Sequence, residues 1–301
     1  MSDEDLAFAL RGVGTAAVGN GFALRDVSFE LPTGFVMGLI GANGAGKTTA
    51  IHCLLGMRPI SSGAIELLGR PVPGPVALRQ DVGVVLDHAF LVGDWRLSEV
   101  ERALRPFYDR WDPLRYRQLL DEFGLDLRAK VRELSRGMSV KLMIAVALSH
   151  GARLLVFDEP TSGLDPVARD ELTGIIGEFL LDEGHSVLFS THITADLDRI
   201  GDYVTLIHDG RIVRTGTKDD VLAAYRVVRG GPDDLDGSGV HLIGMRRTPT
   251  GAQALVATED ADRLGGHVLV EAPTLDDIAV HIGARPPKDR AASVPTGKAA
   301  A

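Results

Sequence analysis

The sequence predicts an α/β fold whose core is a largely parallel sheet, and two observations support this prediction. Several short apolar runs have the length of buried strands, and segments with a helical pattern separate many of them. Strands covered on both faces, as in parallel sheets, read as continuous apolar runs. The candidate strands are residues 22–31, 35–40, 82–86, 153–157, 186–190 and 203–208.

The run at 35–40 leads directly into a glycine-rich segment, which a helix-like stretch to residue 56 follows. The segment matches the pattern G-x-x-x-x-G-K-[ST] in the strand-then-helix context that this pattern requires. Glycines let backbone N–H groups curve around phosphate oxygens, the lysine reaches the β and γ phosphates, and the threonine hydroxyl binds Mg²⁺. We therefore expect ATP and Mg²⁺ rather than a chance glycine-rich turn. The nucleotide-binding residues are Gly41, Ala42, Asn43, Gly44, Ala45, Gly46, Lys47, Thr48 and Thr49.

An all-helical block is inserted between the strands at 82–86 and 153–157. Helices are predicted over 98–110 and 113–123, and a third opens near residue 139 and runs through 147. We expect this helical subdomain to span about 88–150.

The strand at 153–157 ends in two carboxylates, Asp158 and Glu159. Open α/β sheets bind their ligands at this edge. Asp158 suits a Mg²⁺ ligand held through water, and Glu159 suits a general base that orients an attacking water. The alternative is that both acids cap the next helix, which the nearby phosphate loop disfavours.

The pentapeptide Leu-Ser-Arg-Gly-Met at 134–138 precedes the third helix of the block. A serine and a glycine at a helix N-terminus offer a hydroxyl and bare N–H groups, which is an anion site. Taken alone, the pentapeptide reads as an ordinary helix cap.

Together, and in this order and spacing, the segments resemble the ATP-binding subunits of ABC transporters over about residues 24–222. The resemblance implies that 134–138 is the signature that completes the ATP site of the opposite subunit in a head-to-tail dimer, through Ser135 and Gly137. It implies that Asp165, in the stretch after Glu159, communicates between the two sites. His192, behind a Ser-Thr pair at a strand end, matches the switch histidine that contacts the γ-phosphate and joins Lys47 and Glu159 as the catalytic set.

Two departures from the family concern the nucleotide site. Asp87 stands where relatives usually carry a glutamine; a carboxylate can still serve Mg²⁺, and a surface acid is the alternative. The aromatic residue that stacks on adenine in many relatives is expected near Val18 or Gly19. Phe22 is the nearest candidate, or simply a core residue.

A third departure lies in the signature, where Arg136 and Met138 replace glycine and glutamine. The chain resembles ATPases paired with ABC-2-type permeases, which implies export. The features that carry this resemblance are the changed signature, Asp87 and the segments 107–112 and 119–125. The element Pro-Thr-Leu-Asp-Asp-Ile at 273–278 also resembles the C-terminal region of that branch.

The predicted organisation is an ATPase domain at 1–225, a linker at 226–239, a small α+β region at 240–283 and a disordered tail at 284–301. The formal charge of −9 over 301 residues argues against a nucleic-acid partner. Cys53 is the single cysteine, the N-terminus is acidic, and no apolar run is long enough to span a bilayer. We expect a peripheral protein at the cytoplasmic face of the membrane, held by an integral permease and paired with a second copy or a related ATPase subunit.

Three other readings remain in view. A soluble ABC-type ATPase of translation or DNA repair would usually carry two cassettes, coiled-coil insertions or zinc-binding cysteines. A regulatory module would bind ATP without hydrolysing it, and an importer ATPase would serve a different permease.

Overall fold

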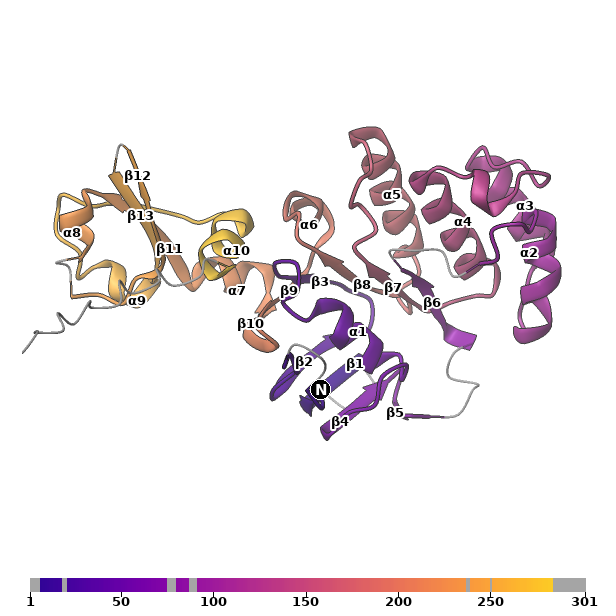
Figure 1. Ribbon diagram of the computed structural model, residues 1–301, viewed down its shortest axis with the longest axis horizontal. Helices are drawn as coiled ribbons and strands as arrows, with labels where there is room; N and C mark the ends of the chain where they lie inside the picture. Colours follow the sequence, from indigo (N-terminus) through magenta and orange to yellow (C-terminus); the bar gives the residue numbers. More distant parts are fainter. Residues whose placement is uncertain are drawn as a thin grey trace, which may run out of the picture.

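The computed structural model describes residues 6–17, 21–74, 80–86, 91–236, 239–249 and 251–283. Figure 1 shows a central sheet with a helical block on one side, a small antiparallel sheet below it and a C-terminal domain on the other side. No helix among the described residues is both long and apolar enough to cross a membrane.

The main sheet has six strands in the order β10-β9-β3-β8-β7-β6. All neighbouring strands are parallel except β10, which pairs antiparallel with β9 at the edge. The prediction of a largely parallel sheet is therefore confirmed. The strands are β3 (Val36–Ile40), β6 (Val82–Val85), β7 (Leu154–Asp158), β8 (Ser186–Thr191), β9 (Tyr203–His208) and β10 (Arg211–Thr217).

A second, antiparallel sheet has the order β2-β1-β4-β5. Only part of β2 was predicted, as the half-buried run 22–31. Helix α1 (Lys47–Leu54) packs between this sheet and the main one, and the buried side chains of all three form one core cluster. The strands are β1 (Leu6–Gly14), β2 (Val27–Pro32), β4 (Ser62–Leu67) and β5 (Arg70–Val72).

The helical block comprises α2 (Leu97–Leu104), α3 (Pro113–Glu122) and α4 (Arg136–Ser149) around the buried ring of Tyr116. Helix α2 ends earlier than the predicted residue 110, because Pro106 has no backbone N–H and lies in a 3-10 turn. Helix α4 begins three residues before the predicted position 139, because the Ser135 side chain caps it.

Three helices follow the last strands of the ATPase core. Helix α5 (Pro166–Phe179) packs beside the helical block, α6 (Ala195–Ile200) follows β8, and α7 (Lys218–Ala223) follows β10.

The C-terminal domain is built on a four-stranded antiparallel sheet in the order β12-β13-β11-β14. The expected linker 226–239 is wrong in part: 225–230 form the central strand β11, since Val227 and Val228 are fully buried on opposite faces, and a short helix, α8, follows. The elements are β11 (Tyr225–Gly230), α8 (Pro232–Asp236), β12 (Ile243–Thr248), β13 (Gly251–Ala257), α9 (Thr258–Ala261), β14 (Leu269–Glu271) and α10 (Leu275–Gly283).

Candidate active site

The glycine-rich loop after β3 has the backbone that its sequence predicts. Gly44 and Gly46 have φ angles of 83° and 116°, in the left-handed region that glycine adopts without strain. At Gly41 a Cβ would lie 2.5 Å from the carbonyl oxygen of Ile207, so no side chain fits there. The bare N–H groups of this loop and of the first turn of α1 fit the phosphates of a nucleotide.

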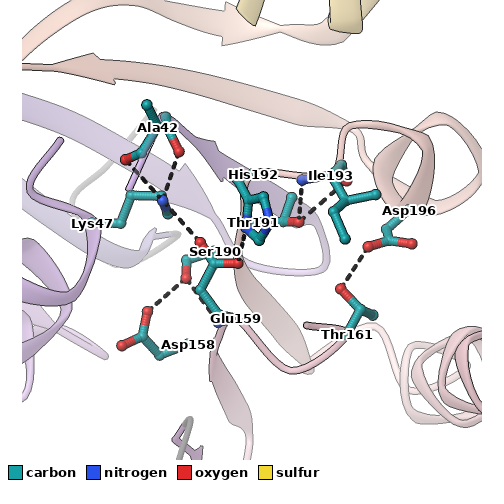
Figure 2. Close-up of polar contacts among 11 residues, drawn as sticks. Ala42, Lys47, Asp158, Glu159, Thr161, Ser190, Thr191, His192, Ile193 and Asp196 are labelled. Carbon is teal, nitrogen blue, oxygen red and sulfur yellow. Dashed lines mark hydrogen bonds and ion pairs between the residues drawn. The ribbon is translucent and has the colours of Figure 1, made fainter. Parts of the chain in front are cut away.

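Lys47, the first residue of α1, is buried and charged. Its side chain is 5% exposed, and its Nζ donates to the carbonyl oxygens of Gly41 at 2.6 Å and Ala42 at 3.3 Å. The same Nζ lies 2.8 Å from Glu159 Oε1 (Figure 2). The ammonium group is thus fixed between the phosphate loop and the end of β7.

Glu159 follows β7 with a φ of 54°, an uncommon angle for a residue with a side chain. Its backbone N–H donates to both the carbonyl oxygen and the hydroxyl of Ser190 on β8. One carboxylate oxygen contacts Lys47, and the other lies 2.6 Å from Nδ1 of His192. The side chain of Glu159 therefore links the ends of three elements at the carboxyl edge of the sheet.

Asp158 is 3% exposed and accepts a hydrogen bond from the Ser190 hydroxyl at 2.7 Å. Thr48 lies in the first turn of α1, next to Lys47. Among the described residues no group of three or more metal-binding side chains occurs. The Asp158 carboxylate and the Thr48 hydroxyl are oxygen donors of the kind that Mg²⁺ takes, and Mg²⁺ is usually held by one or two carboxylates together with substrate phosphates and water. Asp87, the other expected ligand, lies outside the described residues.

His192 directly follows β8 and belongs to the segment 191–196, from the last residue of β8 to the first turn of α6, that we call the switch loop. The Thr191 hydroxyl accepts from the Ile193 N–H at 2.8 Å and so holds the turn. Asp196 accepts from the Thr161 hydroxyl at 2.6 Å, which ties the loop to the segment after Glu159 (Figure 2). The loop thereby presents the His192 ring to the Glu159 carboxylate.

The signature residues lie elsewhere on the molecule. Ser135 is exposed and its hydroxyl accepts from the Met138 N–H at 3.2 Å, while Asp165 caps α5 by accepting from the Ala168 N–H at 2.9 Å. A Cβ on Gly137 would lie 3.6 Å from Leu164. Within the described part of the chain, no hydrogen bond or ion pair joins Ser135, Gly137 or Asp165 to Lys47, Glu159 or His192.

Ser190 and Phe22 have surroundings that the sequence alone did not define. Ser190, which bonds to both Asp158 and Glu159, was visible only as part of the Ser-Thr-His stretch. Phe22 packs against the core, and a Cβ on Gly46 would lie 3.0 Å from its ring, so the structure favours the core interpretation. Val18 and Gly19 lie outside the described residues.

Comparisons with known proteins agree with this geometry. The sequence profile described as ABC transporter matches residues 24–162. The Nod factor export ATP-binding protein I of Sinorhizobium fredii is 31% identical over 96% of this chain and 89% of its own length. The protein of the same name from Neorhizobium galegae is 35% identical over 70% of this chain, which spans 64% of that relative.

Two solved structures are also similar. The ATP-binding subunit of an ABC transporter aligns with a TM-score of 0.65 and 31% identity, over 71% of this chain and 91% of that one. The cbiO1 protein of Clostridium perfringens, part of the cbiONQ transporter complex, aligns with a TM-score of 0.61 over 73% and 92% of the two chains; at 24% identity it supports the fold alone.

The phosphate loop, the buried lysine and the paired carboxylates at the carboxyl edge of a parallel sheet define an ATPase of the phosphate-loop class with an α/β fold. The relatives narrow this class: the chain belongs to the ATP-binding subunits of ABC transporters, which are ATPases that drive transport.

Proposed function

We propose that the chain is the ATP-hydrolysing subunit of an ABC export transporter, of the ABC-2 type, and that it acts at the cytoplasmic face of the membrane through a permease. The contact of one carboxylate, Glu159, with both Lys47 and His192 carries the hydrolytic part of this proposal. The names of the relatives, which describe Nod factor export, support the direction of transport.

In the proposed reaction Glu159 orients a water molecule and accepts its proton as the water oxygen bonds to the γ-phosphorus. The bond from that phosphorus to the β–γ bridging oxygen breaks, and its electron pair leaves with ADP, so the products are ADP and phosphate. His192 positions the γ-phosphate relative to the Glu159 carboxylate, and Lys47 neutralises the charge that develops on the phosphate oxygens. Thr48 and Asp158 would hold Mg²⁺, which supplies further charge neutralisation when bound. Lys47 would exchange its contact with Glu159 for the phosphates, since its Nζ lies between Glu159 and the carbonyl oxygens of the phosphate loop.

We propose a head-to-tail dimer of two copies, or of one copy and a related subunit. The position of Ser135 and Gly137, apart from the cluster around Glu159, supports a site that a second chain completes. The exposed hydroxyl of Ser135 at the N-terminus of α4 is suited to contact the γ-phosphate bound by the other chain, and Asp165 lies at the same surface.

The permease would dock in an apolar cavity of about 320 Å³ between the two parts of the ATPase domain. Its lining includes Met57 after α1, Val84 of β6 and Met143 of α4, so it joins the sheet to the helical block. Met57 is 59% exposed at its rim and Phe107, next to the lining residue Tyr108, is 72% exposed. Exposed apolar side chains beside a cavity are typical of protein–protein contact sites.

Mixing two inactive full-length variants tests the composite site. Lys47→Ala should lose turnover through its own phosphate loop, and Ser135→Arg should lose it by blocking the partner's site. An equal mixture should regain about a quarter of the wild-type ATPase rate, since half of the random dimers contain one intact site out of two. No recovery at protein concentrations where the wild-type chain dimerises would contradict the shared site.

A further inference from the structure

The C-terminal domain contacts the ATPase core through helix α10. Leu275 and Ile278 of this helix are 1% and 0% exposed, and they belong to the same core cluster as Leu197 of α6 and Val204 of β9. Figure 1 shows α10 lying between the C-terminal sheet and α6. Because these two buried aliphatic side chains belong to the hydrophobic core of the ATPase domain, α10 packs against that domain as well as against the C-terminal sheet.

The other side of α10 is fixed to the C-terminal sheet. His281 is 1% exposed, and its Nδ1 donates to the carbonyl oxygen of Gly244 on β12 at 2.8 Å. Gly244 has a φ of 57°, and a Cβ there would collide with the His281 backbone. The helix and the sheet therefore approach at a distance that only glycine permits.

Both ends of α10 lie at loops of the nucleotide site. Near its start, Asp276 Oδ1 accepts from the hydroxyl of Thr194 at 3.3 Å, and Thr194 is 3% exposed within the switch loop. At its end, a Cβ on Gly283 would lie 4.0 Å from Cβ of Ala42 in the phosphate loop. The C-terminal domain thus forms a hydrogen bond with the loop that presents His192 and lies beside the loop that holds Lys47.

The switch loop is held from two sides. Thr161, two residues after Glu159, donates to Asp196 on one side, and Asp276 accepts from Thr194 on the other. His192 lies two residues before Thr194, so a shift of this contact would move the ring relative to the Glu159 carboxylate, only 2.6 Å away. A small misplacement of a reacting group lowers the rate without a comparable loss of substrate binding.

We propose that Asp276 is a positioning residue for ATP hydrolysis and that the C-terminal domain sets the turnover rate through α10. This inference rests on the proposed role of His192. Asp276 acts through Thr194 and the switch loop and does not touch the nucleotide. A partner that binds the C-terminal domain could then change turnover without reaching the ATP site.

The test is steady-state ATPase kinetics of the full-length chain. Asp276→Ala should lower kcat by about two- to fivefold, the effect of losing one partly exposed hydrogen bond to a loop that orients a reacting group, and leave KM for ATP within a factor of about two. Asp276→Asn keeps the acceptor oxygen and should restore the wild-type kcat. Asp233→Ala, the same change at an exposed aspartate on α8, should have no effect.

The partner residue gives a second measurement. Thr194→Val should lower kcat as much as Asp276→Ala. The double variant should show no further loss, because both changes remove the same hydrogen bond. Equal losses for Asp276→Ala and Asp276→Asn, additive losses in the double variant, or an unchanged kcat in Asp276→Ala would overturn the inference.

A His192→Ala chain measured in parallel separates this inference from the proposed function. Unchanged turnover in His192→Ala contradicts both. A slow His192→Ala chain beside a wild-type-like Asp276→Ala chain contradicts the role of Asp276 alone.

Discussion

Two surfaces along the main sheet differ in the polarity of the side chains that form them. At the carboxyl ends of β3, β7 and β8, the Glu159 carboxylate lies within 3 Å of both Lys47 Nζ and His192 Nδ1. Beside the edge strand β6, a cavity is lined mostly by aliphatic side chains and by the buried ring of His150. The first surface suits chemistry on a charged substrate and the second suits an apolar partner, so single substitutions should separate turnover from association.

The largest effect is expected at the charged surface. Glu159→Gln keeps the shape of the side chain but removes its charge and basicity, so we expect the ATPase rate to fall by about 100- to 1,000-fold while ATP still binds. Size-exclusion chromatography with ATP should then show a trapped dimer. The control is Glu178→Gln, the same change at an exposed position on α5. Undiminished hydrolysis by Glu159→Gln would rule out this residue as the base.

A substitution at the apolar surface should have the opposite profile. Met57→Glu places a carboxylate at the rim of the cavity, and burying it against an apolar partner should weaken association with the permease by at least about tenfold. ATP affinity of the isolated chain should not change. Co-purification with the membrane partner measures the effect, and Leu181→Glu, at an exposed leucine after α5, is the control. Equal recovery of permease with both variants would place the docking surface elsewhere.

A third effect, on stability instead of turnover or association, concerns His150, which Tyr108 covers in a stacked arrangement with ring centroids 4.1 Å apart. Burial lowers the pKa of His150 to about 4, despite its hydrogen bond to the carbonyl of Gln80 and the nearby Asp81 carboxylate. Because the unfolded chain then binds this proton more readily than the folded one, stability is full above about pH 6.5 and falls as the pH drops towards 4, by up to about 3 kcal/mol.

Urea unfolding at pH 7 and at pH 4.5 measures this loss. His150→Gln keeps a donor for the Gln80 carbonyl but does not titrate, so its stability should depend less on pH than that of the wild type. The exposed His241→Gln should behave as the wild type does. Identical pH slopes for wild type and His150→Gln would show that the ring is protonated without cost.

The sequence predicted the parts of the fold whose pattern is local. Strands β3, β7 and β8 are continuous apolar runs because they are buried on both faces, and their ends are marked by the phosphate loop, the acid pair and Ser-Thr-His. Strand β1 pairs irregularly with β2 and contains one exposed polar residue, Arg11, and β11 runs into a glycine-rich stretch. Neither strand was predicted.

The residues of the candidate site were predictable where a local motif marks them, and their contacts were not. Lys47, Glu159 and His192 could each be named from motifs, and the structure brings them together. Their contact depends on how three elements end at one edge of the sheet, which spacing alone does not give. The bonds of Ser190 to the acid pair and of Asp276 to Thr194 join residues 31 or more positions apart, and no local pattern marks them.

The left-handed backbone of Glu159 has a consequence for how this protein can change. A side chain at such an angle costs on the order of 1 kcal/mol, which glycine at the same position would avoid. Replacement by glycine would thus relieve the backbone while removing the carboxylate that links Lys47 to His192. A relaxed backbone and the link between Lys47 and His192 therefore exclude each other at this position: glycine would provide the first, and glutamate provides the second.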